Sequence, residues 1–201
     1  MFSSLLAIAT ALAVSSIPTI VGLPTSRCNC QGTNFTDPTF FCGDSRLGPA
    51  VLPTTGELGV LLNHYDRLGG LCPGEFLAKW TLNGTYQFPP INGFQISTTG
   101  MPIEGNETFV PGMLLDRFGH ATGGFLAPAD TPFSQRSLPP SSLGPPTNYH
   151  IYRVEVNNLT VLTGTIAPWF SQPGQGTQYE LPEGTSVQTL LDAGILTEIA
   201  Q

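Results

Sequence analysis

Two arginines in one loop-forming segment are the residues of this sequence best suited to bind an anionic ligand. Arg117 and Arg136 lie within residues 115–140, LDRFGHATGGFLAPADTPFSQRSLPP, in a chain with only seven Lys and Arg residues. A planar guanidinium donates two parallel charge-assisted hydrogen bonds to a phosphate group. Gly and Pro favour loop backbone, and loops carried by a rigid scaffold often bind ligands. The alternative is two surface arginines in an ordinary Pro-rich loop, because Gly and Pro occur in any turn.

The overall charge restricts the class of ligand. The chain has 201 residues and a formal net charge of −7, which argues against nucleic acid as a partner, because nucleic-acid-binding surfaces are basic. An acidic surface also repels anionic small molecules at long range. Any anionic ligand must therefore be held by local arginines, which makes the positions of the few arginines informative.

The N-terminal residues and four glycosylation sequons predict a secreted or cell-surface glycoprotein. An apolar run from Leu5 to Val14 is too short to span a bilayer and predicts a signal peptide over residues 1–20. No later segment is long and apolar enough to predict a membrane span. Glycans are expected at four sequons, those of Asn34, Asn83, Asn106 and Asn158.

Four cysteines in the N-terminal third predict two disulfides in an oxidising compartment. They are Cys28, Cys30, Cys42 and Cys72. A Cys28–Cys30 bond would close a very tight ring, so two sets of pairs remain open: 28–42 with 30–72, or 28–72 with 30–42. A zinc site fits less well, because the spacing is wrong and no histidine lies nearby. We predict a disulfide-stapled segment over residues 21–53, followed by one domain over residues 54–201.

Local patterns predict the elements that must position the arginines. Apolar spacing and end signals predict helices over residues 58–68, 73–80 and 186–193. β-Branched and aromatic residues predict strands over 149–156 and 159–166, with a turn at 157–158, and a turn-rich strand pair within 84–96. With 19 Pro and 23 Gly, this mixture predicts a small α+β domain with a twisted, mainly antiparallel sheet.

Three further residues have competing interpretations. DRLGGLCPGEFLA, residues 66–78, is similar to DRFGHATGGFLA, residues 116–127, but only the second precedes the Arg-containing, Pro-rich stretch. We therefore interpret Arg67 as structural. His150 lies within a predicted strand, and we expect a structural role for it too. Trp169 is compatible with a place in a pocket wall or over the core.

Several motifs occur in an order that resembles a known family. DRFG is followed by G-x-FL-x-P-x-x-TPF-x-x-RSLPP, by the YHIYRV strand and by a late PG-x-GTQY. This series is similar to the tuberculosis necrotizing toxin domain, over residues 58–196. Within that family, the disulfide-stapled secreted form resembles the fungal surface NAD glycohydrolases.

The resemblance implies that NAD⁺ is hydrolysed to nicotinamide and ADP-ribose. Carried over by position, Arg117 is a catalytic-site arginine, and Phe118 packs on the nicotinamide side. Arg136 becomes the partner of the pyrophosphate, and Gln178 contacts the nicotinamide ribose and is needed for turnover. NAD⁺ is then the substrate, and no cofactor is implied. Other fungal members carry an acidic C-terminal cluster that can hold a metal ion; we expect no metal site in this sequence, which lacks one. The resemblance also suggests a homodimer.

The chemistry of NAD⁺ agrees with a site that lacks paired carboxylates. Most glycosidases need one carboxylic acid to protonate the leaving oxygen and a second carboxylate opposite it. Nicotinamide in NAD⁺ is already cationic and departs neutral, so it needs no acid, and a Gln amide can orient ribose hydroxyls or water. NADP⁺ is a second candidate substrate. The rival functions are ADP-ribosyl transfer and non-enzymatic nucleotide binding by a secreted glycoprotein.

Overall fold

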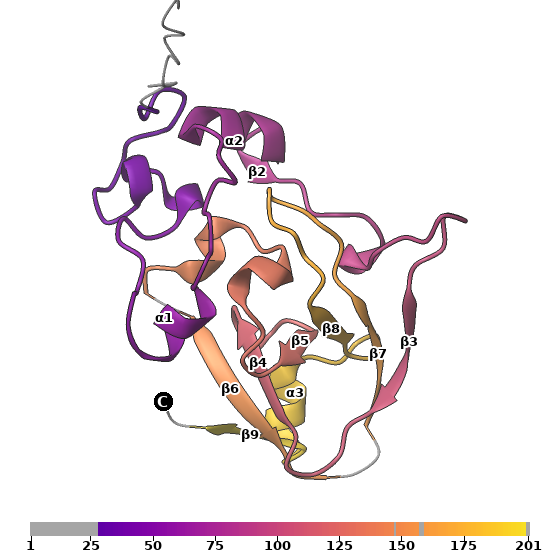
Figure 1. Cartoon of the computed structure of the whole chain (residues 1–201). Helices are drawn as coiled ribbons and strands as arrows, with labels where there is room; N and C mark the ends of the chain where they lie inside the picture. Colours follow the sequence, from indigo (N-terminus) through magenta and orange to yellow (C-terminus); the bar gives the residue numbers. More distant parts are fainter. Residues whose placement is uncertain (1–27, 147, 157–158, 200–201) are drawn as a thin grey trace, which may run out of the picture.

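The computed structural model describes residues 28–146, 148–156 and 159–199, and within them the main element is a seven-stranded antiparallel sheet (Figure 1). The strand order is β3-β7-β8-β5-β4-β6-β9. The bounds along this order are β3 Glu104–Thr108, β7 Thr160–Thr165, β8 Thr177–Glu180, β5 Phe125–Pro128, β4 Leu114–Phe118, β6 Tyr149–Val154 and β9 Leu196–Ile199. Each neighbouring pair is antiparallel. The predicted α+β fold with a mainly antiparallel sheet is confirmed.

Short helices and 3₁₀ turns lie before and between the strands along the chain. Their bounds are α1 Gly56–Leu61, α2 Pro73–Trp80 and α3 Val187–Asp192, and the shorter 3₁₀ turns are η1 Phe41–Gly43, η2 Ser45–Leu47, η3 Ile91–Gly93, η4 Phe133–Arg136 and η5 Pro140–Leu143. Pro73 begins α2, and the Glu75 carboxylate accepts a hydrogen bond from the Cys72 backbone N–H (3.0 Å). The Ser186 hydroxyl caps α3 by accepting from the Thr189 N–H (3.2 Å). The predictions for 73–80 and 186–193 are confirmed.

Helix α1 is shorter than the predicted helix over residues 58–68. The chain leaves helical geometry after Leu61, and His64 has a left-handed φ of 62°. Leu61 and Leu62 are buried in one cluster, whereas Leu68 is buried in another. The helical spacing of these leucines therefore reflects burial in two separate places and not one continuous helix face.

The predicted strands over 149–156 and 159–166 form β6 and β7, but they are not neighbours. β6 lies between β4 and β9, whereas β7 lies between β3 and β8. The turn predicted at 157–158 lies outside the described residues. Local composition indicates a strand but not its partner, because pairing depends on the hydrophobic faces that the rest of the fold supplies.

Residues 84–96 do not form the predicted strand pair. Only β2 (Thr85–Tyr86) is a strand in that range, and it pairs with β1 (Thr81–Leu82). The connecting Asn83-Gly84 has φ values of 51° and 82°, as a two-residue hairpin turn requires. The remainder contains turn η3, which the sequence did not reveal.

One of two disulfides attaches the N-terminal segment to the rest of the protein, and the other lies within the segment. Cys28 bonds to Cys72 and Cys30 bonds to Cys42, which is one of the two sets that the sequence left open. The Cys28–Cys72 bond joins the segment to the start of α2. Segment 21–53 is thus covalently tied to the predicted domain over 54–201.

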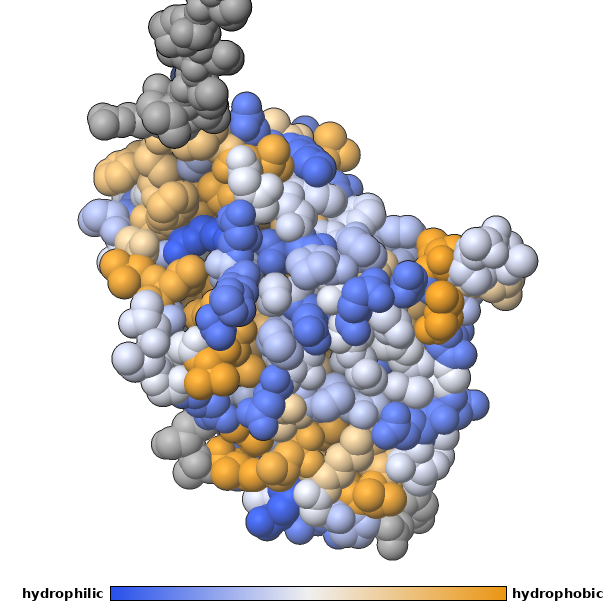
Figure 2. Space-filling model, viewed as in Figure 1, coloured by the Kyte–Doolittle hydropathy of each residue, from blue (hydrophilic) through white to orange (hydrophobic). Residues whose placement is uncertain are grey.

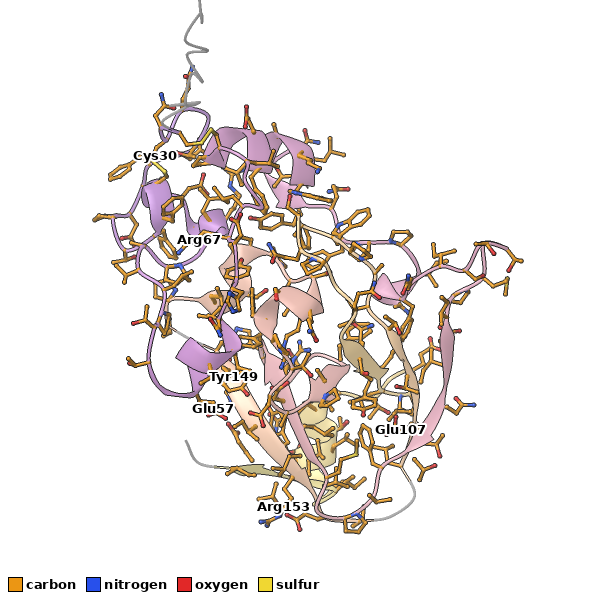
Figure 3. The ribbon with its side chains drawn as sticks, in the orientation of Figure 1. Cys30, Glu57, Arg67, Glu107, Tyr149 and Arg153 are labelled. Carbon is orange, nitrogen blue, oxygen red and sulfur yellow. A yellow bond between two sulfur atoms is a disulfide. The ribbon has the colours of Figure 1, made fainter. Side chains whose placement is uncertain are left out.

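Arg67 holds the same segment by non-covalent contacts (Figure 3). Its Nη1 donates to the backbone carbonyls of Leu47 (2.8 Å) and Pro49 (2.6 Å), and its guanidinium lies 4.6 Å from the ring centroid of Phe41. A half-buried cation with carbonyl partners and an aromatic ring stabilises local structure. The structural interpretation of Arg67 is confirmed.

The largest core cluster lies between the sheet and α3. Leu190 of α3 packs in one cluster with Leu115 of β4 and Tyr179 of β8, and all three are buried. Because side chains alternate along a strand, Asp116, Phe118 and Gln178 lie on the opposite face of the sheet. The core therefore fixes the strands whose other face carries predicted site residues.

The visible surface mixes polar and apolar residues. Figure 2 shows several separate hydrophobic groups on a face that is otherwise largely hydrophilic. No helix within the part of the chain that the structure describes is long and apolar enough to cross a membrane.

Candidate active site

Arg117 lies near the end of β4 and presents a cation with unused donors. Its Nε donates to the carbonyl of His120 (2.9 Å), and its Nη1 donates to the carbonyl of Phe125 (2.7 Å). Of the five guanidinium N–H groups, these bonds leave one on Nη1 and both on Nη2. The ion pairs found among the described residues do not include Arg117. Burial lowers the pKa of the Arg117 guanidinium, but arginine stays protonated at neutral pH. Arg117 is therefore the unneutralised positive charge of this site.

Glycines make room for this arginine. A Cβ atom at Gly123 would lie 1.8 Å from Nη2 of Arg117, so any side chain there would displace the guanidinium. Gly119 has a φ of +127°, which only glycine adopts without strain. The Gly-rich stretch after β4 thus serves close packing against Arg117.

Arg136, by contrast, is almost fully engaged with the protein. It is 6% exposed, and Asp116 beside it is 0% exposed. Its Nη1 and Nη2 donate to the two Asp116 oxygens at 2.5 and 2.6 Å, while Nε and Nη2 both donate to the carbonyl of Thr131 (2.9 and 2.7 Å). One Nη1–H remains. Arg136 therefore has one donor left for a ligand, and Asp116 balances its charge.

Tyr149 completes the buried group around Asp116. Its hydroxyl donates to Oδ2 of Asp116 (2.9 Å), and burial followed by the charge of Asp116 raises the pKa of Tyr149. The hydroxyl therefore remains a donor at neutral pH. Burial also raises the pKa of the Asp116 carboxyl, while the hydrogen bonds from Arg136 and Tyr149 act in the opposite direction. Both carboxylate oxygens of Asp116 therefore accept hydrogen bonds within this buried group.

Phe118 forms an apolar surface supported by other rings. Its ring centroid lies 4.9 Å from that of Phe133 and 4.6 Å from that of Tyr149, and the Arg136 guanidinium carbon lies 5.2 Å from it. Aromatic contacts at these distances hold a ring in place. Phe118 is thus a rigid part of the site.

Gln178 reaches the site from β8. Its Nε2 donates to the backbone carbonyl of Asn92 in η3 (2.8 Å). Because a carbonyl oxygen only accepts, this contact selects the amide nitrogen and leaves Oε1 of Gln178 free to accept. The glutamine therefore presents an acceptor of fixed orientation.

One cavity of about 400 Å³ brings the predicted site residues together. Arg117, Phe118, Arg136 and Gln178 all line it. A second cavity of about 780 Å³ adjoins it and shares Phe88, Phe118 and Ser142 in its lining. Phe88 is 62% exposed, so its ring lies at the surface between the two cavities. The paired cavities suit a ligand with two bulky ends.

Sequence reasoning missed Asp116 and Asn92. Asp116 directly precedes Arg117 in the sequence. In a chain with few basic residues, an acid next to a candidate site arginine could have indicated that Asp116 belongs near the site. Asn92 belongs to an Ile-Asn-Gly turn that looks like any other loop. Its contact with Gln178 spans 86 residues, so no local pattern could indicate it.

Two residues with competing interpretations, His150 and Trp169, and the nearby His120 have clear positions. His150 contacts Glu198 (2.6 Å between Nδ1 and Oε1) and Asn148 and lines neither cavity, in agreement with a structural role. His120 lines the larger cavity. Trp169 packs against Trp80, with ring centroids 5.2 Å apart, and borders a core cluster, so it covers the core.

Other predicted sites concern the surface. Asn34, Asn83 and Asn106 are exposed, as glycan attachment requires, and Asn158 lies outside the described residues. Glycosylation itself stays a prediction. Within residues 28–146, 148–156 and 159–199, no group of three or more His, Cys, Asp or Glu side chains could hold a metal ion.

Comparisons with known proteins place this geometry in context. A family model described as tuberculosis necrotizing toxin matches residues 108–199. The conidial surface nicotinamide adenine dinucleotide glycohydrolase nadA of Aspergillus fumigatus is 49% identical over 179 residues, which cover 85% of this chain and 75% of that protein.

Two solved structures are also similar. Tuberculosis necrotizing toxin complexed with its immunity factor IFT is 21% identical, with a TM-score of 0.48, over 92% of this chain and 98% of that chain. Rhs1-CT in complex with its cognate immunity protein RhsI1 is 20% identical, with a TM-score of 0.34, over 49% of this chain and 78% of that chain.

Proposed function

Because the chain belongs to the tuberculosis necrotizing toxin family and is an NAD⁺ glycohydrolase, we propose that it cleaves the nicotinamide N-ribosyl bond in the cavity lined by Arg117, Phe118 and Gln178. It is a secreted or cell-surface protein, as its conidial surface relative is. The observation that carries the placement is the convergence of side chains from β4, η4 and β8 on one cavity.

The two arginines have different roles in substrate binding. Arg117 has three free N–H groups and no carboxylate partner among the described residues, so it supplies most of the positive charge for the pyrophosphate. Arg136 adds its one remaining Nη1–H and keeps Asp116 and Phe118 in place. Phe118 provides the apolar contact for nicotinamide. The resemblance assigned the pyrophosphate to Arg136; we propose Arg117 as the stronger anion ligand instead, because it has more free donors.

Bond cleavage needs positioning more than acid catalysis. The C1′–N bond breaks with its electron pair going to the pyridine nitrogen, so nicotinamide leaves neutral. The ribose carbon becomes an oxocarbenium-like centre, and water adds to it and loses a proton to solvent. Oε1 of Gln178 accepts a hydrogen bond from a ribose hydroxyl or from this water. A preorganised acceptor beside a developing positive charge lowers the barrier without reorganisation.

Release of nicotinamide is the direct test. Purified protein incubated with NAD⁺ and a chelator is expected to form equal amounts of nicotinamide and free ADP-ribose, resolved by timed chromatography. The absence of nicotinamide would contradict the proposed activity. ADP-ribose found attached to an acceptor in place of free ADP-ribose would indicate transfer instead of hydrolysis.

The larger cavity is proposed to hold the adenosine half and to accept NADP⁺ as well. Among the described residues that line it there is no Asp or Glu whose carboxylate would repel a 2′-phosphate. We expect kcat/KM for NADP⁺ to lie within about tenfold of kcat/KM for NAD⁺, because no carboxylate among these lining residues opposes the 2′-phosphate. A carboxylate beside that phosphate would weaken binding by several kcal/mol. Steady-state assays with both dinucleotides measure the ratio.

A charge introduced into this cavity provides the control. Ser141 lines it, and Ser141→Asp is expected to reduce turnover of NADP⁺ more than that of NAD⁺, whereas Ser141→Asn should affect both alike. Failure of the unmodified protein to cleave NADP⁺ would exclude the larger cavity as a tolerant 2′-phosphate site.

A further inference from the structure

Two side chains of β8 contact the same turn at the edge of the smaller cavity. Gln178 donates from Nε2 to the backbone carbonyl of Asn92 (2.8 Å), and Glu180 accepts at Oε1 from Nδ2 of Asn92 (2.7 Å). Residues two apart on a strand face the same side, so both can reach one turn. Asn92 and Gly93 of this turn line the cavity.

The turn is strained and needs support from its surroundings. Ile91, Asn92 and Gly93 have φ values of 51°, 52° and 86°. Asn and Gly tolerate this left-handed region, but a β-branched residue such as Ile91 is strongly disfavoured there. Such a backbone persists only where neighbouring contacts hold it, and strained turns cluster at functional sites. The Asn92–Glu180 hydrogen bond is one of those contacts.

The same contacts determine which atom Gln178 presents. The Asn92 carbonyl accepts from Nε2, so Oε1 is left as the acceptor beside Gly93. A shift of the turn would release the amide and let it rotate. The position of the Asn92 carbonyl therefore controls the orientation of the glutamine.

Glu180 is an unusual choice for folding alone. Its Oε2 is buried and has no hydrogen-bond partner among the residues that the structure describes. A buried polar atom without a partner destabilises the folded state. The hydrogen bond that the other oxygen, Oε1, accepts from Asn92 gives a reason why Glu180 is present at this cost.

We propose that Glu180 and Asn92 are positioning residues for NAD⁺ hydrolysis: together they hold turn η3 so that the Asn92 carbonyl fixes the Gln178 amide with Oε1 toward the ribose. The inference rests on the proposed role of Gln178. Neither residue needs to touch the substrate for this role.

Kinetics of matched variants test the proposal. Glu180→Ala and Asn92→Gly are each expected to lower kcat by about 10- to 100-fold with little change in KM, because a misplaced group costs rate more than binding. Glycine is used at 92 because it adopts a φ of 52° without steric cost. Glu180→Gln keeps an acceptor oxygen and should retain near-wild-type kcat. The exposed Glu183→Ala is the control, and all four variants should melt near the wild-type temperature.

The double variant supplies the decisive comparison. If Glu180 and Asn92 act as one unit, combining Glu180→Ala with Asn92→Gly lowers kcat no further than either change alone. Wild-type kcat in both single variants, or losses that multiply in the double variant, would overturn the inference. If Glu180→Ala does not fold, Asn92→Gly decides, because its side chain is exposed. An inactive wild-type protein would contradict the proposed function instead.

Discussion

Replacement of Gln178 by alanine is expected to lower kcat by about 10²- to 10³-fold, the loss typical when one preorganised hydrogen-bonding group is removed from a transition-state site. Its Oε1 is free to accept because Nε2 is bound to the Asn92 carbonyl, and it belongs to the cavity that Arg117 also lines. KM should change far less, because the pyrophosphate contacts remain. Steady-state nicotinamide release at varied NAD⁺ concentration separates the two parameters.

A second glutamine provides the matched control. Gln188 is exposed on α3, which packs on the other face of the sheet, and Gln188→Ala should leave both parameters unchanged. A raised KM with unchanged kcat in Gln178→Ala would mean that Gln178 only binds substrate. That result would remove it from the chemical step.

Replacement of Asp116 by alanine is expected to reduce the free energy of unfolding by about 3–5 kcal/mol, because it leaves the Arg136 guanidinium buried without its partner. For a protein of this size the melting temperature should fall by roughly 10 °C. Circular dichroism during heating measures it. The exposed Asp192→Ala on α3 serves as the control and should change stability little.

A double replacement separates the fold from the site. Asp116→Leu combined with Arg136→Met removes both charges, and the pair is expected to recover much of the lost stability, since apolar side chains often replace a buried ion pair without loss. The recovered protein should still bind NAD⁺ weakly, because the remaining Nη1–H of Arg136 is gone. Full stability in Asp116→Ala would contradict the structural role of the pair.

The same ion pair explains why Arg136→Ala alone is an ambiguous test of pyrophosphate binding. Removing Arg136 leaves the Asp116 carboxylate buried without its ion-pair partner. The variant would therefore lose both affinity for NAD⁺ and free energy of unfolding. Among the residues that the structure describes, Arg117 has only backbone carbonyls as hydrogen-bond partners, so it offers the cleaner test of charge.

The sequence by itself determined several local elements and the residues proposed for the site. Pro73 predicted the start of α2, and Thr185 or Ser186 predicted the cap of α3, because such end signals depend on residues within one turn. The motif order pointed to the family, and with it to Arg117, Phe118, Arg136 and Gln178. These signals lie within short stretches of sequence, so they can be recognised without knowledge of the folded structure.

Only the tertiary structure decided which residues meet. It paired β6 and β7 with other strands, selected Cys28–Cys72 over Cys28–Cys42, and joined Arg136 to Asp116. It also placed Asn92 against Gln178, across 86 residues. These choices depend on long-range packing of faces that are alike in sequence, and a local pattern contains no information about its distant partner. The sequence therefore determined which side chains are available, and the fold decided how two arginines and a glutamine come to line one cavity.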